Sequence, residues 1–205
     1  IGGLPVAEDV KRVGSVLRLL EPGMTLAVDG NGTFSLETAL QYADALSSYP
    51  LRWIEEPVPP LDYEMHRALA QRCNLPIATG ENLFSADDAR NLLRHGGLRA
   101  DRDILQFDIS LGYGIVEYRR ILRDLDDHGW RRSSCAPHAG HLLALNVVAG
   151  LGLGAGEVAM DESTLFGRVT AGLPMKDGRA ILPDAPGVGF EQCAAFDELF
   201  SGLLP

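Results

Sequence analysis

Hydrophobic residues along the chain follow two alternating patterns. Three stretches repeat apolar residues at every third or fourth position, which predicts helices with one buried face, at residues 10–20, 36–46 and 115–125. Short apolar runs flanked by Gly, Pro or Asp are typical of buried strands and lie at residues 26–28, 51–54, 76–78, 104–107 and 133–136. Because strand, loop and helix follow one another in regular succession, the pattern predicts parallel βα units.

Polar residues at the predicted helix starts and turns support this division. Ser35 precedes one helix, and Ser85 stands three residues before Asp88 in a capping-box pattern. After about residue 160 the alternation stops. The remaining chain carries turn-forming pairs such as Asp177-Gly178, which suit short strands and a closing tail.

The composition restricts the classes of partner. The 205 residues include 18 basic and 28 acidic side chains, a formal charge of −10. Nucleic acids and anionic membrane surfaces are bound chiefly through Lys and Arg, so we expect neither as a partner. With 46% hydrophobic and 22% charged residues, the composition is that of a soluble globular protein. The longest weakly polar stretch, residues 142–156, contains Asn146 and is shorter than the roughly 18 residues of a membrane span.

The cysteines give no sign of a metal or redox site. Cys73, Cys135 and Cys193 lie far apart and lack C-x-x-C spacing. Reduced thiols in a cytoplasmic protein are the simplest interpretation.

A carboxylate or a histidine follows each predicted strand. Asp29, Glu55, Glu81 and Asp108 lie 26 or 27 residues apart, and His138 follows 30 residues later. A single acid after a strand is most often a solvated loop residue or a helix cap, but the shared position and even spacing favour a common role. In a closed parallel barrel the carboxyl ends of the strands converge on one face, so these side chains would meet in one cup.

Carboxylates that meet in a cup require a counter-charge. Three of them would repel one another unless a cation lay between them. The candidate ligands Asp29, Glu55 and Glu81 are all oxygen donors, which favours Mg²⁺, with Mn²⁺ as a substitute, and disfavours zinc. Asp108 and His138 are either a structural hydrogen-bonded pair or a carboxylate that orients an imidazole and raises its pKa for proton transfer.

Other polar residues are expected outside this cup. His66, His95 and His128 stand among polar residues, and we expect them at the surface. Glu56 follows Glu55 directly, and side chains alternate in direction along a strand. We therefore expect Glu56 to point away from the site.

Several motifs carry a resemblance to a known family. The three at the strand ends are Val28-Asp29-Gly30-Asn31, Trp53-Ile54-Glu55-Glu56-Pro57 and Thr79-Gly80-Glu81-Asn82. They resemble the metal-ligand motifs of the enolase superfamily, in its mandelate racemase and muconate lactonizing enzyme branch. The resemblance covers nearly the whole chain through Gln106-Phe107-Asp108, Pro137-His138-Ala139-Gly140-His141, Gly152-Leu153-Gly154, Leu182-Pro183-Asp184 and Pro186-Gly187-Val188-Gly189-Phe190. Within the branch the chain is most similar to D-tartrate dehydratase and related acid-sugar dehydratases.

The resemblance implies roles for residues of the first three motifs. Asp29, Glu55 and Glu81 would be ligands of Mg²⁺. Asn31 and Asn82 would orient these ligands or contact the substrate.

It also implies a proton-transfer pair, in which Asp108 would hold His138. Glu157 would contact the carboxylate side of the substrate, unless Asp161 or Glu162 faces the cup in its place.

The implied reaction is the dehydration of a hydroxy acid, either a tartrate or an acid sugar. A base removes the α-proton, Mg²⁺ stabilises the resulting enolate, and His138 protonates the departing β-hydroxyl, so that a 2-keto acid forms. A racemase, epimerase or cycloisomerase of the same superfamily would use the same metal ligands, and an inactive metal-binding relative would keep only the fold. The substrate would be a small anionic hydroxy acid, and because family members are commonly homo-oligomers we expect one here.

The implied fold is a TIM-like (βα)7β barrel, of which this chain would cover the C-terminal part, from about strand 3 to strand 8, without the N-terminal lid domain. Residues 1–160 would form the partial barrel that carries the metal site, and residues 161–205 a C-terminal closing segment. In the tartrate dehydratase pattern a Lys-x-Lys run leads into Ile-Gly-Gly, so the opposing base would stand just before Ile1. We therefore expect residues 1–205 alone to be inactive, because the base and the water-excluding lid lie outside them.

Overall fold

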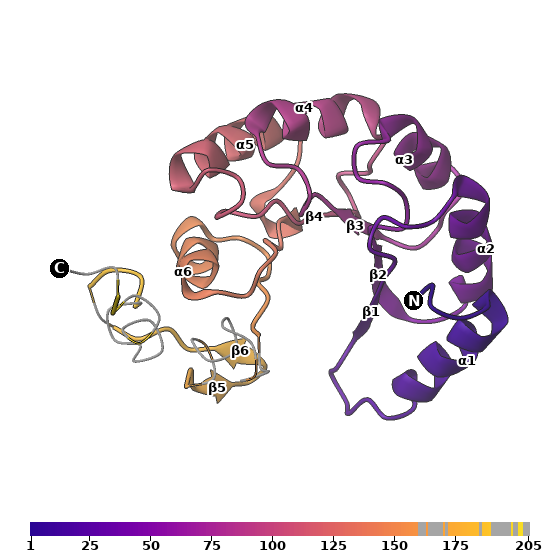
Figure 1. The fold of residues 1–205 in the computed structure, drawn as a ribbon, viewed down its shortest axis with the longest axis horizontal. Helices are drawn as coiled ribbons and strands as arrows, with labels where there is room; N and C mark the ends of the chain where they lie inside the picture. Colours follow the sequence, from indigo (N-terminus) through magenta and orange to yellow (C-terminus); the bar gives the residue numbers. More distant parts are fainter. Residues whose placement is uncertain are drawn as a thin grey trace.

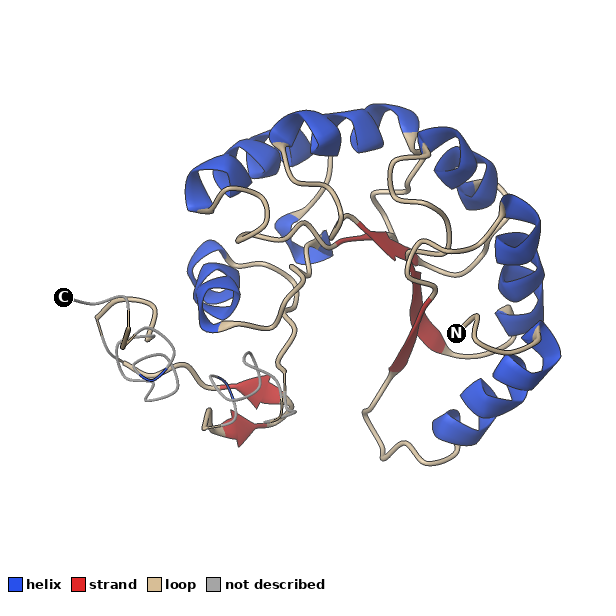
Figure 2. Cartoon of the chain, viewed as in Figure 1, coloured by secondary structure: helices blue, strands red, loops and turns tan. Residues whose placement is uncertain are grey.

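Helices and parallel strands alternate through most of the chain. The computed structural model describes residues 1–159, 163, 170, 172–184, 186–189, 198 and 201–202. The elements follow in the order α1 Val6–Leu17, β1 Leu26–Asp29, α2 Leu36–Leu46, β2 Leu51–Glu55, α3 Tyr63–Ala70, β3 Ile77–Thr79, α4 Ala86–His95, β4 Ile104–Leu105, α5 Ile115–Asp127, the 3-10 helix η1 Arg132–Ser134, α6 Leu142–Leu151, β5 Met175–Lys176 and β6 Arg179–Ala180. Figure 2 shows the helices along the outside of an open arc and the strands β1 to β4 along its inside.

The strands β1 to β4 form one parallel sheet in chain order. Asp29 pairs with Glu55 at the carboxyl ends of β1 and β2, and Thr79 pairs with Leu105 at the ends of β3 and β4. Helices α1 to α5 cover the outer side of this curved sheet (Figure 1). The carboxyl ends of the strands therefore lie at one edge, which places the residues that follow them close together.

A 3-10 helix takes the place of most of the fifth predicted strand. Residues 133–136 were expected to be extended, but η1 occupies Arg132–Ser134, and in the described chain this segment pairs with β4 only through a parallel bridge between Leu105 and Cys135. Ala136 and His138 still donate backbone hydrogen bonds to the carbonyl oxygens of Leu105 and Gln106. The chain thus follows the edge of β4, and His138 comes to the same edge of the sheet as the acids.

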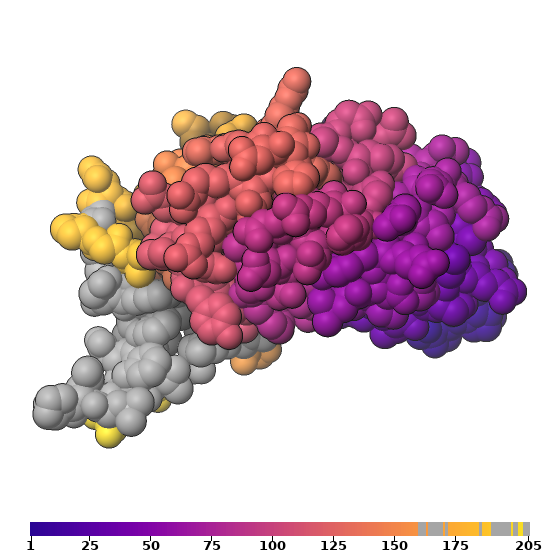
Figure 3. Space-filling model, turned by 90° about the horizontal axis from the view of Figure 1, so that it is seen from above, coloured from indigo at the N-terminus to yellow at the C-terminus, as the bar shows by residue number. Residues whose placement is uncertain are grey.

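Two groups of buried side chains attach the helices to the sheet. One joins α1, α2 and α3 to the first strands through residues such as Leu46, Ile54 and Ile77. The other joins α4, α5 and α6 to β4 through residues such as Leu105 and Ile121. Burying one such side chain contributes roughly 1.5–3 kcal/mol, so these interfaces hold the arc together. Neighbouring outer helices pack side by side into a continuous surface (Figure 3).

The predicted helix starts are present. The hydroxyl oxygen of Ser35 accepts a hydrogen bond from the amide of Thr38, and that of Ser85 accepts one from the amide of Asp88. Ser85 also donates to the Asp88 carboxylate at 2.8 Å. These caps satisfy amides that have no partner inside the helix and set where α2 and α4 begin.

His66 does not lie at the surface, so that expectation was wrong. Its side chain is fully buried on the face of α3 that also buries Leu69 and Ala70. The polar neighbours that suggested exposure occupy the opposite face of the helix. Burial lowers the pKa of His66 to about 4, because the charged imidazolium would lose its hydration.

Short strands occur in the tail, as the turn-forming residues predict. β5 and β6 pair antiparallel across Asp177 and Gly178. The φ angles of these two residues are 51° and 71°, and a two-residue turn of the type that joins such strands needs positive φ at both positions. Asp161, Glu162, Phe190 and Cys193 lie outside the described residues.

No helix in the described ranges is long and apolar enough to cross a membrane.

Candidate active site

The predicted ligands lie on one edge of the sheet because of the sheet register. Asp29 and Glu55 are the last residues of β1 and β2 and are paired across the sheet. Glu81 follows β3 by two residues, and Asp108 follows β4 by three. All four therefore lie at the carboxyl edge of the sheet, in the arrangement expected from their spacing.

Asp29 and Glu55 accept hydrogen bonds from nearby donors. The backbone amide and side-chain amide of Asn31 donate to the two carboxylate oxygens of Asp29, at 2.7 and 2.6 Å. The indole N–H of Trp53 donates to Glu55 at 2.8 Å. Both carboxylates are partly exposed, whereas Asn31 is exposed.

Glu56 also belongs to the site, contrary to the expectation from alternation. β2 ends at Glu55, and Glu56 has a positive φ of 33°, so the alternation of an extended strand does not continue to it. Its side chain is 1% exposed, and Oε2 accepts a hydrogen bond from the side-chain amide of Asn82 at 2.7 Å. We call Asp29, Glu55, Glu56 and Glu81 the acid cluster.

The carboxylates of the acid cluster influence one another. Burial, and after it the negative charge of Glu56, raises the pKa of Glu81, while the charge of His138 opposes this rise. Burial also raises the pKa of Glu56, against the effect of its hydrogen bond with Asn82. Such uncompensated negative charge attracts a cation or a proton.

A histidine and an aspartate form a pair beside the acid cluster. Nδ1 of His138 lies 3.0 Å from Oδ2 of Asp108, and the other Asp108 oxygen accepts the backbone amides of Ser110 and Leu111. Burial raises the pKa of Asp108, but these hydrogen bonds outweigh it and lower the pKa overall. The hydrogen bond with Asp108 raises the pKa of His138 against the effect of burial.

The geometry of this pair fixes the direction of the imidazole. An ionised carboxylate only accepts hydrogen bonds, so Nδ1 of His138 carries the proton shared with Asp108. Nε2 lies on the opposite side of the ring, 4.0 Å from a carboxylate oxygen of Glu81. His138 therefore connects Asp108 to the acid cluster and can hold a proton at Nε2.

Glu157 contacts the backbone of Ala139, the residue after His138. Its carboxylate accepts the backbone amide of Ala139 at 2.9 Å, and its negative charge helps to raise the pKa of His138. Burial raises the pKa of Glu157 itself. The alternatives Asp161 and Glu162 lie outside the described residues.

Sequence reasoning missed the contact between Ser110 and His141. The Ser110 hydroxyl oxygen and Nε2 of His141 are 2.6 Å apart, and Nδ1 of His141 accepts the amide of Ala144 at the start of α6. This contact ties the loop after Asp108 to α6. The position of His141 directly before an apolar helical run was the signal that could have identified it as a helix cap.

The donor set fits Mg²⁺, although the ligands are not gathered around one point. Among the described residues, no three Asp, Glu, His or Cys side chains lie closely enough together to hold a metal ion. Like charges repel, and Asp29 and Glu55 turn to Asn31 and Trp53 instead. Within the same residues no Lys or Arg forms an ion pair with Asp29, Glu55 or Glu81, so an oxygen-rich, negatively charged site remains for a hard cation.

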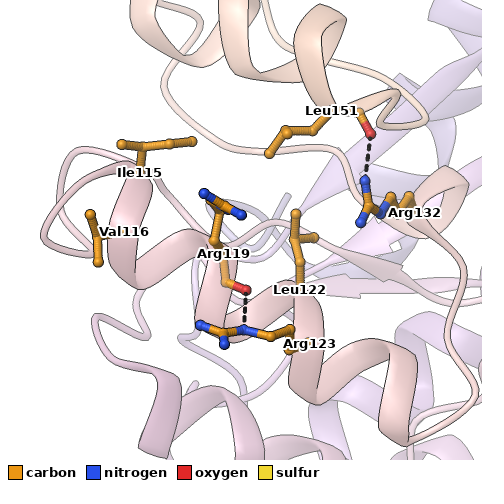
Figure 4. A pocket seen from close by; sticks show the side chains of 7 residues that line it. All are labelled: Ile115, Val116, Arg119, Leu122, Arg123, Arg132 and Leu151. Atoms are coloured by element: carbon orange, nitrogen blue, oxygen red, sulfur yellow. Dashed lines mark hydrogen bonds between the residues drawn. The ribbon is translucent and has the colours of Figure 1, made fainter.

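A sizeable cavity lies elsewhere, in a groove between α5 and α6 (Figure 4). Its volume is about 620 Å³. It is lined by Ile115, Val116, Arg119, Leu122, Arg123, Arg132 and Leu151. None of these is an acid or a histidine, so the groove is separate from the acid cluster and from His138.

A curved parallel sheet with helices outside it and acids at its carboxyl edge defines the chain as part of a TIM-type α/β barrel. A family model described as "Enolase C-terminal domain-like" matches residues 1–195. The chain belongs to this family, in the mandelate racemase and muconate lactonizing enzyme branch of the enolase superfamily. The fold class and the family expected from the motifs are thereby confirmed.

Characterised relatives include dehydratases and a cycloisomerase. L-talarate/galactarate dehydratase of Salmonella typhimurium is 31% identical over 93% of this chain and 46% of its own length. The 3,6-anhydro-alpha-L-galactonate cycloisomerase of Streptomyces coelicolor is 28% identical over 92% of this chain and 50% of its own length. L-talarate dehydratase from Polaromonas sp. JS666, solved with Mg and L-glucarate, is 31% identical with a TM-score of 0.78, over 92% of this chain and 50% of that one. The chain thus spans about half the length of these relatives.

Proposed function

We propose that the complete enzyme is a Mg²⁺-dependent dehydratase that converts a hydroxy acid, a tartrate or an acid sugar, into a 2-keto acid. The observation that carries this proposal is the position of His138. Its Nδ1 is held by buried Asp108 at 3.0 Å, and its Nε2 faces the acid cluster. The proposed metal ligands and the proposed proton-transfer group thus lie on the same edge of the sheet.

Asp29, Glu55 and Glu81 are the residues that would hold Mg²⁺, or Mn²⁺ in its place. A bound divalent cation supplies a Lewis acid that neutralises charge on a substrate carboxylate. Asn31 and Asn82, which donate to the acid cluster, would orient its carboxylates or contact the substrate.

His138 is the proposed acid that protonates the departing hydroxyl. Its raised pKa keeps Nε2 protonated at neutral pH, and Asp108 holds the ring so that this proton faces the site. Glu157, fixed by the amide of Ala139, would lie on the carboxylate side of the substrate.

The opposing base would have to approach from another strand. The amino nitrogen of Ile1 donates to the carbonyl oxygen of Asp29 at 2.7 Å. A lysine immediately before Ile1, as in the tartrate dehydratase pattern, is the base that we propose.

The relatives support a dehydratase and keep one alternative open. Dehydratases of talarate, galactarate, arabinonate and galactonate are among them. Cycloisomerases with similar sequences share the family, so ring opening or closure of a sugar acid is the second candidate.

The test is product analysis with the complete enzyme, Mg²⁺ and a panel of tartrates, aldonic acids and sugar diacids. We expect loss of water and formation of a 2-keto acid, detected as its semicarbazone and by mass, with no product when Mg²⁺ is removed by a chelator. Conversion without a change in mass would instead favour an isomerase. Turnover that is insensitive to the chelator would contradict the proposed metal site.

A further inference from the structure

The carboxylate of Glu56 is held rigidly inside the acid cluster. Its backbone amide donates to Ala78 of β3, and its carbonyl oxygen accepts the amide of Gly32 from the loop after β1, at 2.9 and 2.7 Å. The side chain is 1% exposed. Oε2 accepts from Asn82, and among the described residues Oε1 has no hydrogen-bond partner. Both the backbone and the side chain of Glu56 are therefore held by hydrogen bonds.

This fixed carboxylate determines how the amide of Asn82 is turned. Nδ2 of Asn82 lies 2.7 Å from Oε2 of Glu56 and 3.4 Å from Oε1 of Glu81. Both neighbours are carboxylate oxygens, which accept hydrogen bonds, so the N–H2 group of the amide must face them. The carbonyl oxygen of the same planar amide is consequently turned away from both carboxylates.

Asn31, in the loop after β1, shows the same arrangement. Its Nδ2 donates to Asp29 at 2.6 Å, so its amide oxygen also faces away from the acid cluster. Asn31 and Asn82 are both exposed. The side-chain amide oxygens of Asn31 and Asn82 are thus available as hydrogen-bond acceptors beside the acid cluster. The hydroxyl groups of a polyhydroxy acid are matching donors.

We propose that Glu56 is a positioning residue that fixes Asn82 so that Oδ1 of Asn82 accepts a hydrogen bond from a substrate hydroxyl. This inference rests on the proposed function, because it requires a hydroxy-acid substrate. A substrate that lacks this hydroxyl loses one hydrogen bond to Asn82 and should bind more weakly.

The test measures the effect of Glu56→Gln on the complete enzyme, once with Asn82 present and once in an Asn82→Ala background. Gln can place an N–H2 group beside Asn82. The side-chain amide of Asn82 is then free to rotate by about 180° and exchange the positions of its oxygen and nitrogen. We expect KM for the best hydroxy acid to rise about tenfold with kcat within about threefold, because ground-state and transition-state binding are lost together. In an Asn82→Ala background, the same substitution should change KM less than about twofold. Glu64→Gln, which removes the same charge from an exposed side chain of α3, is the matched control and should change nothing.

Two readouts separate this inference from other outcomes. Calorimetric titration with Mg²⁺ should give an affinity for Glu56→Gln within about threefold of the parent, whereas loss of Mg²⁺ binding would show Glu56 to be a ligand and overturn the positioning role. An equal rise of KM in both backgrounds, or no rise in either, would also overturn it.

If the parent enzyme converts no hydroxy acid, the proposed function fails. In that case, slow solvent exchange of the Asn82 side-chain amide protons, accelerated by Glu56→Gln, would still show that Glu56 fixes the amide.

Discussion

Glu55 and Glu56 are adjacent in sequence, but their carboxylates have different surroundings. Glu55 ends β2, is partly exposed and accepts the indole N–H of Trp53. Glu56 has a positive φ of 33°, a backbone conformation that residues other than glycine adopt rarely. Its carboxylate is buried beside Asn82. The positive φ of Glu56 therefore gives its carboxylate different surroundings from the carboxylate of Glu55. Glu55 is a proposed metal ligand, and Glu56 is the proposed positioning residue.

At Glu55, the expected effect of substitution is on metal binding. Glu55→Gln removes one of three proposed Mg²⁺ ligands and lowers the repulsion within the acid cluster. We expect at least a tenfold loss of Mg²⁺ affinity by calorimetry, no detectable Mg²⁺-dependent turnover by the complete enzyme, and an unchanged circular dichroism spectrum. Retained activity at the Mg²⁺ concentration that saturates the parent would remove Glu55 from the ligand set.

At Asp108, the expected effect is on the pH profile. The hydrogen bond with Asp108 raises the pKa of His138, so the imidazole stays protonated to a higher pH than a free histidine would. Asp108→Asn should therefore move the basic limb of kcat against pH to lower pH and reduce kcat about 100-fold or more. The measurement is a pH-rate profile at saturating Mg²⁺. An unmoved basic limb would show that His138 is not the acid.

At the scale of elements, α3 contains an ionisable group that is completely buried in the fold. His66 lies on the inner face of α3 and has no exposed surface. The buried position follows from the helical spacing it shares with Leu69 and Ala70. Burial therefore favours the neutral imidazole at this position.

Acid should therefore destabilise the fold through His66. The pKa of His66 is about 4 in the folded chain, below its ordinary value of 6.5, so the unfolded chain binds a proton first as the pH falls. This contribution to stability is complete above pH 6.5 and is lost between pH 6.5 and 4. We expect about 2 kcal/mol less stability at pH 5 than at pH 7 from this group, measured by urea denaturation.

Two variants isolate the contribution of His66. His66→Phe should remove this part of the pH dependence, whatever its effect on stability at pH 7. His95→Gln, at an exposed position of α4, is the control and should keep it. The same slope in all three proteins would show that another group causes the acid sensitivity.

At the scale of the whole molecule, the acid cluster lies on an incomplete barrel. In the described residues the main sheet has four strands and a single bridge to Cys135, whereas a TIM barrel closes with eight strands. The relatives are about twice as long as this chain. We propose that the opposing base of the reaction lies outside the described residues.

Residues 1–205 on their own are therefore expected to be inactive. A purified polypeptide of these residues should show no formation of keto acid from any acid that the complete enzyme converts, because proton abstraction requires the opposing base. The assay is the same product analysis with excess Mg²⁺. Turnover by this polypeptide would show that both proton-transfer groups lie within it.

Sequence patterns predicted much of the site because strand ends are a local property. Asp29, Glu55, Glu81 and Asp108 each follow a short apolar run, and parallel strands in register bring such positions to one edge. The spacing therefore predicted which acids lie on one edge of the sheet, and the motifs predicted the family. The caps at Ser35 and Ser85 were predictable for the same reason, since a cap depends on residues within one turn.

The tertiary structure decided what depends on contacts between segments. The burial of His66 depends on how α3 packs in the fold, and the inward position of Glu56 depends on a backbone turn held by hydrogen bonds with Gly32 in the loop after β1 and with Ala78 of β3. The contact between Ser110 and His141 joins residues 31 positions apart. The sequence by itself determined which residue types end the strands, because periodicity and caps act over a few residues. Their orientation was decided only in the fold, because burial and hydrogen bonding between distant segments outweigh local alternation.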